Sequence, residues 1–395
     1  MKTRLSLLSI VVFVLMCIAA IPLPGQSLNS IVLYGILPFV AFISFCQEKK
    51  FIVNQYTQIF YILFFWLILT SLFSVSIETS FLNVKRALGS VLTCYIFAVQ
   101  AKRRQFIPYL YIVFIVLFLS TVNYVVNNFL INFDKIGGRQ RIGDDSLNAN
   151  TLAYYTVYVT FICFILGEIV KSHKLQKVLR ILFFAAIPLS FWVAIITASR
   201  QVLMIQIPLI AILCYFRYVK FDTAKTKIIV LLFLFIIVYA YFADSVIEQY
   251  NKSYLAERSE VSVTEDSRFV LIEESILLGL NNLLVGVGPG CVSLFTTERA
   301  FAHNTFLELF AGTGIIGMII FIVLVWKYFK TQIIRYKKTR DKLFMYFIVF
   351  GFIFLVQQFL YVFYASLWLM GFFMLVATHS DTYYKSKYIY NESNI

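Results

Sequence analysis

The sequence predicts an all-α membrane protein that crosses the bilayer about twelve times, with both termini in the cytoplasm. Hydrophobic residues make up 61% of the 395 residues and charged residues only 14%, whereas soluble domains have about half and a quarter. The hydrophobic residues form uncharged runs long enough to cross roughly 30 Å of hydrocarbon as helices. Loops rich in Lys and Arg, moreover, alternate along the chain with loops that contain few. We therefore expect one integral membrane domain, residues 1–395.

The predicted spans follow one another along most of the chain. The fourth and eighth runs are short, and the last two allow a different division. The first run begins like a signal peptide, but no small-residue cleavage site follows it, so we expect it to remain as the first helix. The twelve runs cover residues 5–22, 28–46, 57–75, 86–100, 106–126, 151–169, 180–197, 201–216, 228–243, 305–326, 343–359 and 361–378.

Basic residues are concentrated in the loops that this topology places in the cytoplasm. The inner segments carry 24 of the 34 Lys and Arg residues and 6 of the 20 Asp and Glu residues, and the outer segments carry the rest. This is the positive-inside distribution, and it supports an even number of spans. The net charge of +14 therefore indicates basic loops that face anionic membrane lipid, and we expect no nucleic-acid partner.

Neither the cysteines nor the polar residues within the spans indicate a metal or transport site. The six cysteines form no Cys-x-x-Cys pair, and all but Cys291 lie in or beside apolar runs, so we expect all six to be packing residues. The polar residues in the middle of spans are uncharged: Asn123, Gln206, Gln357 and Gln358. Because ion-coupled transporters use charged midplane groups or broken helices, this pattern disfavours a transporter.

Two predicted outer loops are long enough to contain a reaction site, residues 127–150 and residues 244–304. The second is large and connects the ninth and tenth spans. Within it, apolar residues at positions 269, 270, 272, 276, 277 and 280 recur at the spacing of an amphipathic helix. Such a helix is expected to lie at the outer boundary of the membrane. The glycine-rich segment 286–290 then predicts a tight turn.

Several arginines on the outer side are candidates for binding an anion. Arg200 interrupts apolar sequence at the tip of a tight hairpin. The positive-inside rule disfavours it there and the loop offers no acid to pair with it, so anion binding is favoured over snorkelling to the interface. Arg268 begins the amphipathic helix, where anion binding and a local salt bridge are equally supported. Arg258 and Arg299 are weaker candidates, because each is typical of a solvated loop charge.

His303 is one of only three histidines and precedes the tenth span. Thr305 and Glu308 have the spacing of a capping box, so His303 is expected at an outward helix N-terminus. The helix dipole there favours a neutral imidazole, which can accept a proton, and the free N–H groups suit phosphate. The alternative is a histidine that fills space at the interface. The glycines between residues 312 and 317 are expected to let a neighbouring helix approach closely.

An ordered set of motifs resembles the O-antigen ligase and polymerase superfamily. His303, Asn304, Gly314 and Gly317 fit the pattern His-[Asn/Ser/Gln]-nine residues-Gly-x-x-Gly. Upstream, TASRQ resembles the Ser-Arg motif of the family, although Gln201 stands where glycine is common. SRFVLIEESILLGLNNLLVGVGPG is similar to its Arg-led helix, and NANTLAYY is similar to its Asn-x-Asn-x-Leu-Ala element. The resemblance covers about residues 145–325.

The resemblance implies a metal-independent, inverting glycosyltransferase on the outer face of the bacterial cytoplasmic (inner) membrane, with no cofactor. The donor would be a glycan on polyprenyl pyrophosphate. In this family pattern, Arg200 and Arg268 hold the pyrophosphate, and His303 is the general base that accepts the proton of the acceptor hydroxyl. The weaker candidates for substrate binding are Asn304, Asn150, Arg299 and Arg258.

Three functions remain open, and the first is favoured. A repeat-unit polymerase of O-antigen, capsule or exopolysaccharide fits a motif region that has the family pattern without extra basic loop residues. The alternative is an O-antigen ligase that transfers finished polymer to lipid A–core; extra basic loop residues suited to a phosphorylated core would favour it. A flippase of lipid-linked sugar would predict internal repeats and midplane polar sites. The expected partners are the lipid-linked donor, a glycan or lipid A–core acceptor, membrane lipid and other polysaccharide-assembly proteins.

Overall fold

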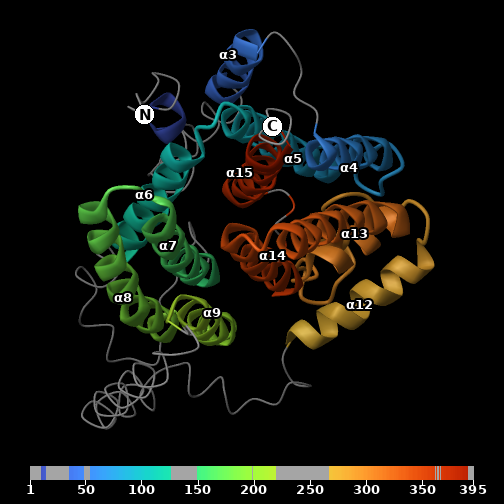
Figure 1. Ribbon diagram of the computed structural model, residues 1–395. Helices are drawn as coiled ribbons and strands as arrows, with labels where there is room; N and C mark the ends of the chain where they lie inside the picture. The colour runs from blue at the N-terminus through green and yellow to red at the C-terminus, as the bar shows by residue number, and fades with distance from the viewer. Residues whose placement is uncertain are drawn as a thin grey trace, which may run out of the picture. The chain divides into compact units, whose positions relative to one another are not determined.

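The computed structural model describes residues 10–14, 35–48, 54–125, 149–218 and 267–389, apart from residues 198, 361, 363 and 365. Every regular element within these ranges is a helix, which confirms the predicted all-α class (Figure 1). Six of these helices are long and apolar enough to cross a membrane, and three shorter ones are also apolar. The count of twelve stays a prediction, because the ninth predicted span, 228–243, lies outside the described residues.

The chain divides into two compact units, which are described separately. Unit 1 contains residues 1–113 and 263–395, and unit 2 contains residues 114–262. The helix α6 (Phe106–Val125) begins in unit 1 and ends in unit 2. The helices of unit 1 are α3 (Leu37–Glu48), α4 (Gln55–Ser71), α5 (Ile77–Lys102), α12 (Ser267–Asn281), α13 (Thr305–Thr339), α14 (Lys342–Leu360) and α15 (Leu367–Tyr384), with short turns η5 (Val292–Leu294) and η6 (Lys385–Ile389). Those of unit 2 are α7 (Ala149–Ile169), α8 (His173–Ile196) and α9 (Arg200–Tyr218).

Buried aromatic side chains hold α13, α14 and α15 of unit 1 together. The ring of Tyr328 in α13 lies 4.9 Å from that of Phe373 in α15 and 6.4 Å from that of Phe350 in α14, centroid to centroid. Edge-on and tilted arrangements at such distances stabilise aromatic pairs. On its other side α15 packs against α5, where a Cβ on Gly371 would lie 2.7 Å from the Thr93 methyl carbon. This core supports the N-terminal parts of α5 and α13.

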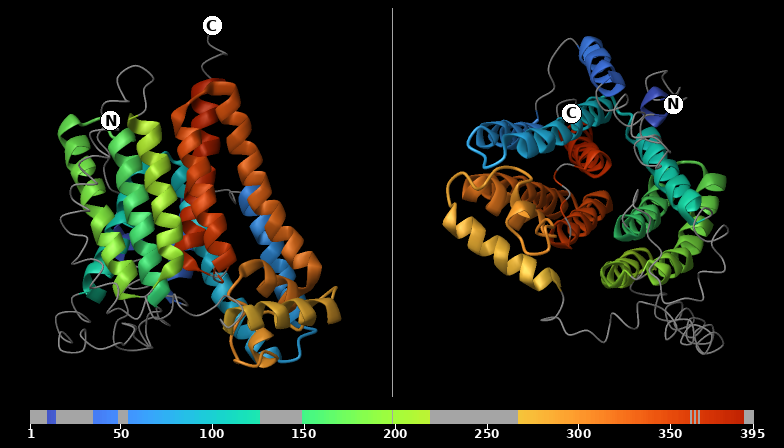
Figure 2. Two further views of the ribbon diagram at one scale, coloured as in Figure 1. Left: turned by 90° about the horizontal axis from the view of Figure 1, so that it is seen from below. Right: turned by 180° about the vertical axis from the view of Figure 1, so that it is seen from behind.

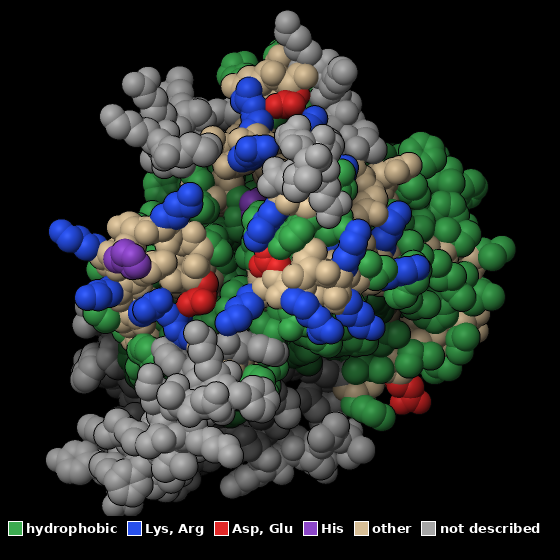
Figure 3. All heavy atoms as spheres, in the orientation of Figure 1, with side chains coloured by type: hydrophobic (Ala, Val, Ile, Leu, Met, Phe, Trp, Pro, Cys, Tyr) green, Lys and Arg blue, Asp and Glu red, His purple; other side chains and the backbone are tan. Residues whose placement is uncertain are grey.

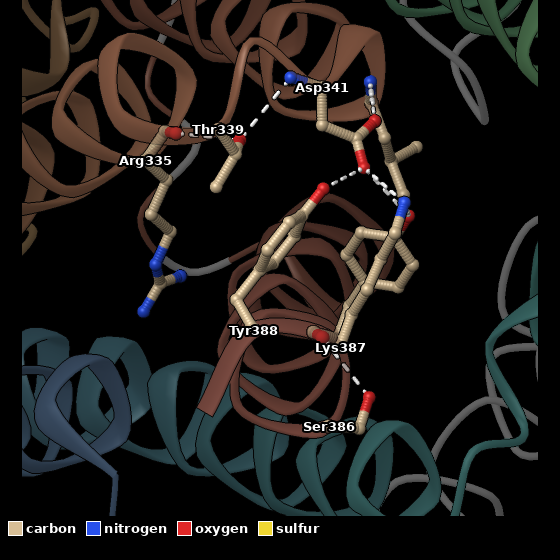
Figure 4. A network of polar contacts seen from close by, with 8 residues as sticks. Arg335, Thr339, Asp341, Ser386, Lys387 and Tyr388 are labelled. Carbon is tan, nitrogen blue, oxygen red and sulfur yellow. Dashed lines mark hydrogen bonds and ion pairs between the residues drawn. The ribbon is translucent and has the colours of Figure 1, made fainter. Parts of the chain in front are cut away.

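The opposite ends of α13, α14 and α15 are joined by the carboxylate of Asp341. Its Oδ2 atom accepts hydrogen bonds of 2.8 Å each from Lys387, Tyr383 and Tyr388 (Figure 4). Partial burial acts to raise the pKa of Asp341, but the hydrogen bonds outweigh it and lower that pKa to about 2. Asp341 is therefore ionised at neutral pH, and it offsets part of the positive charge around it.

Lys and Arg side chains gather on the face of unit 1 that contains this network (Figure 3). Lys102 ends α5, and Lys337 and Lys338 lie in the last turn of α13. Basic side chains at helix C-termini also complement the helix dipole. These are the segments that the positive-inside rule assigns to the cytoplasm.

Unit 2 contains two of the predicted polar residues within spans, Asn123 in α6 and Gln206 in α9. Gln206 in α9 is buried and donates a hydrogen bond of 3.1 Å to the hydroxyl oxygen of Thr160 in α7. At the far end of the same helices, Arg217 forms a salt bridge of 2.8 Å with Glu168. Polar contacts of this kind join helices within a membrane. Gln206 is thus explained by helix packing.

Candidate active site

His303 lies directly before α13, as predicted, but the cap of the helix differs from the predicted one. Asn304 is the N-cap, and its side-chain oxygen accepts hydrogen bonds of 2.9 and 3.2 Å from two backbone N–H groups of the first turn. The predicted capping box of Thr305 and Glu308 is therefore wrong. Asn is among the strongest N-cap residues, and the Thr305 hydroxyl instead donates to Gln358 of α14 at 2.7 Å.

The backbone at His303 is held in a left-handed conformation by residues on both sides. Its φ angle is 51°, a conformation that is strained for residues other than glycine and is often found at functional sites. The buried Glu308 fixes the preceding residue, since its Oε2 atom accepts a hydrogen bond of 3.0 Å from Ala302 N. The half-buried imidazole lies against Phe301, with ring centroids 4.4 Å apart. The first turns of α13 thus fix the position of His303.

The helix α13 is interrupted at Gly314, within the predicted Gly-x-x-Gly pattern. The φ and ψ angles there are 73° and −177°, a combination that essentially only glycine adopts. The break exposes backbone groups that must find other partners in a membrane protein. Three carbonyl oxygens of α13 accept hydrogen bonds from outside the helix: Ala311 O from Val287 N (3.0 Å), Gly312 O from Gly288 N (2.8 Å) and Thr313 O from Trp66 Nε1 of α4 (2.9 Å). In the other direction, Ile315 N donates to Leu283 O (2.8 Å).

The glycines at 312 and 314 therefore admit a loop rather than the neighbouring helix that the sequence suggests. A Cβ on Gly314 would overlap the carbonyl oxygen of Leu284, and one on Gly288 would overlap the Ser74 side chain. The prediction was therefore wrong for Gly312 and Gly314, because apolar spacing cannot distinguish a helix neighbour from a loop neighbour. At Gly317 a neighbouring helix does approach closely, since a Cβ there would lie 3.2 Å from Trp66 Cδ1 of α4. The Gly-x-Gly-Pro-Gly segment lies directly against residues 311–313, immediately before the Gly-x-x-Gly pattern.

A buried polar cluster anchors the same loop to the start of α5. The thiol of Cys291 lies 3.3 Å from the hydroxyl oxygen of Ser74 and 3.2 Å from that of Ser80. Val75, the residue after Ser74, donates a hydrogen bond of 3.1 Å from its backbone N–H to Val287 O. Cys291 is fully buried, so it is a packing residue, as predicted for the cysteines. The segment between α12 and α13 is therefore attached to the turn between α4 and α5, to α5 and to α13.

A helix, α12, covers residues 269–280, where the sequence predicts an amphipathic helix. It lies across the N-terminal end of α13 (Figure 2), and a Cβ on Gly279 would overlap the Phe310 ring. Its buried side is narrow and includes Leu271 and Ser275. Its apolar residues are mostly exposed: Phe269, Val270, Ile276, Leu277 and Leu280. Such an unburied apolar face is typical of helices at a membrane surface, but that location stays a prediction.

The two main arginine candidates each lie at a helix N-terminus. Arg268 is the second residue of α12 in unit 1, and Arg200 is the first residue of α9 in unit 2. The predicted tight hairpin before Arg200 is confirmed, because α8 ends at Ile196 and a hydrogen bond of 2.9 Å from Ser199 N to Ala194 O closes the turn. The approach of Arg200 and Arg268 to His303 stays a prediction.

The weaker candidates have less support from their positions. Arg299 is exposed in a short turn, where its N–H donates to Thr296 O at 3.0 Å, in keeping with a solvated loop charge. Asn150 is the second residue of α7. Arg258 lies outside the described residues.

The helices and the outer segment packed on α13 define the class, a multi-pass helical membrane protein. Residues 181–322, about a third of the chain, match the family model described as O-antigen ligase. The match confirms the predicted resemblance to the O-antigen ligase and polymerase superfamily, and it contains Arg200, Arg268 and His303. The family implies an enzyme that transfers glycosyl groups, with lipid-linked glycans and lipid A–core as its general substrates. A comparison with curated proteins gives no match.

Proposed function

We propose that the protein is a metal-independent, inverting glycosyltransferase that acts on glycans linked to polyprenyl pyrophosphate. It works at the outer face of the bacterial cytoplasmic membrane. The observation that carries this proposal is the position of His303, which is fixed before α13 by Asn304 and Glu308 within the segment that matches the family. A half-buried imidazole at a helix N-terminus combines a proton acceptor with nearby N–H groups that favour anions.

In the proposed reaction, an acceptor hydroxyl attacks the anomeric carbon of the donor. The new C–O bond forms as the bond from that carbon to the pyrophosphate oxygen breaks, and the leaving polyprenyl pyrophosphate keeps the bonding electron pair. The imidazole of His303 accepts the hydroxyl proton. Attack from the face opposite the leaving group inverts the anomeric configuration.

The role assigned to Arg200 and Arg268 is to bind the pyrophosphate and stabilise its developing charge. A guanidinium group presents a planar fork of donors that matches phosphate oxygens, which an ammonium group cannot reproduce. Fixed cations at the leaving group act on charge that develops only in the transition state. Two such groups can therefore take the part that a divalent metal has in other glycosyltransferases.

The lipid part of the donor gives a reason for the apolar surface of α12. Because α12 packs on the first turns of α13, a position at the outer membrane boundary would bring lipid close to His303. The exposed residues Leu277 and Leu280 are then in contact with lipid rather than water. This arrangement suits a donor whose tail stays in the bilayer while its pyrophosphate reaches the site.

A repeat-unit polymerase is favoured over a ligase, as the sequence suggests. Deletion of the gene distinguishes the functions. Loss of a polymerase leaves single repeat units on the acceptor core, whereas loss of a ligase leaves long chains on the lipid carrier. Loss of a flippase leaves single units on the cytoplasmic side. We expect single repeat units on the acceptor core, measured by gel analysis of surface glycan and of the extracted lipid carrier. Long carrier-linked chains would favour the ligase. Single units that face the cytoplasm would contradict glycosyl transfer altogether.

A further inference from the structure

The outer part of α5 contains two basic residues that the positive-inside rule does not explain. Lys85 and Arg86 are both exposed. Arg86 follows Ile77, the first residue of α5, by nine positions, which places it about 14 Å along the helix axis. A cation in a membrane span is costly and is usually retained for a function. Arg86 has no salt bridge to any other residue in the described part of the chain.

Arg86 shares a helix face with Asn83, since residues three apart on a helix are neighbours. The side-chain oxygen of Asn83 accepts a hydrogen bond of 2.8 Å from the hydroxyl of Tyr364. A Cβ on Gly290 would lie 2.8 Å from Asn83 Nδ2. This face of α5 therefore points towards both the glycine-rich loop and the segment between α14 and α15.

Tyr364 connects this face of α5 with the residues that position His303. Burial, and then the carboxylate of Glu308, raise the pKa of Tyr364, while Asn83 and the charge of Arg86 act to lower it. Glu308 accepts the hydrogen bond of Ala302 N, the residue before His303. The geometric link is the glycine-rich loop, which packs on Asn83 at Gly290 and bonds to α13 through the hydrogen bond from Gly288 N to Gly312 O. The face of α5 that carries Asn83 therefore packs on the loop that is itself bonded to the first turns of α13.

We propose that Arg86 is a third phosphate-binding residue of the outward site, and that its guanidinium binds the pyrophosphate oxygens of the lipid-linked donor. This inference rests on the proposed function. It assigns to unit 1 a cation carried by a rigid membrane helix, in addition to the arginines of α9 and α12. A guanidinium in this position would contribute charge-assisted hydrogen bonds to the phosphate group.

The test is the affinity of the purified protein for farnesyl pyrophosphate, a short polyprenyl pyrophosphate. Binding is measured in nanodiscs of neutral phosphatidylcholine, so that anionic phospholipid does not compete. Arg86→Gln is expected to raise Kd about tenfold or more, because a hydrogen bond to a charged group is lost. Arg86→Lys is expected to recover only part of the affinity. The matched control is Lys102→Gln, which removes a cation from the inner end of the same helix and is expected to leave Kd unchanged.

Each outcome decides the proposal. If Arg86→Gln leaves Kd unchanged while the wild-type protein binds and transfers glycan, Arg86 has no role in binding and the proposed function stands. If Arg86→Gln does not fold, Arg86→Lys decides, and an unchanged Kd in that variant overturns the inference. Binding of phosphatidylglycerol is measured separately, in nanodiscs that contain it. If Arg86→Gln weakens only that binding, Arg86 contacts membrane lipid and the inference is overturned. Failure of the wild-type protein to bind the pyrophosphate would remove the proposed function together with the inference.

Discussion

Replacing His303 by Ala is expected to lower the rate of glycan transfer by about 10²–10⁴-fold, the usual contribution of a general base. The amount of protein in the membrane is expected to stay the same. The imidazole lies before the helix, and the groups that fix this segment are Asn304 and Glu308, which the substitution leaves in place. The rate is measured with purified protein and a polyprenyl-pyrophosphate-linked oligosaccharide, and product length is followed on gels.

His173 supplies the control for this experiment. It is exposed at the first position of α8, so His173→Ala removes the same side chain from a surface without a proposed role.

The same assay with Arg200→Lys or Arg268→Lys is expected to show a loss of about 10²-fold in the transfer rate, the usual effect of removing one donor that stabilises developing negative charge. Full activity of His303→Ala would contradict the assignment of the base, and full activity of both lysine variants would contradict the role of the guanidinium forks.

Replacing Gly314 by Ala is expected to destabilise the protein by roughly 3 kcal/mol and to abolish transfer. The φ of 73° and ψ of −177° are accessible essentially to glycine alone, and the added Cβ would overlap the Leu284 carbonyl. Restoring a regular helix would displace the loop whose backbone bonds to residues 311 and 312. Thermal unfolding in detergent measures the loss. Trp66, which donates to Thr313 O at 2.9 Å, reports the local change by fluorescence in a background where the other three tryptophans are replaced by Phe.

Gly167→Ala is the matched control for the interrupted helix. Gly167 lies inside α7, and an added Cβ there would meet its nearest neighbour, Leu179 Cβ, at an ordinary distance of 3.7 Å. Because alanine is the better helix former, this variant is expected to be unchanged or slightly more stable. Equal melting temperatures of Gly314→Ala and Gly167→Ala would show that the break at Gly314 is not required.

The sequence predicts the elements of this protein better than the contacts between them. Hydropathy and charge predict the membrane helices, and the spacing of apolar residues predicts α12, since both depend on local pattern alone. The hairpin before Arg200 is predictable because two apolar runs leave only a few residues to connect them. The break at Gly314 is not predictable, because the apolar sequence continues across it. The loop that stabilises the break lies about 30 residues away along the chain.

Parts of the candidate site depend on residues that no local pattern connects. Tyr364 and Asn83 form a hydrogen bond although 281 positions separate them. At the start of α13, Asn304 and Thr305 are both good N-cap residues, so the sequence allows two helix starts and the hydrogen bond from Thr305 to Gln358 favours the earlier cap. His303 and the arginines, in contrast, are noticed from sequence because titratable groups are rare in such an apolar chain.

The proposed function requires that Arg200 and His303 reach one site on the outer side of the membrane, and a pair of spin-label distances can decide whether they do. Cysteines for labelling are placed at positions 200 and 303, and separately at 217 and 303, in a background without native cysteines. Residues 200 and 217 lie near opposite ends of α9, about 25 Å apart along the helix. We expect the 200–303 distance in nanodiscs to be much shorter than the 217–303 distance. Equal distances, or a shorter 217–303 distance, would contradict it.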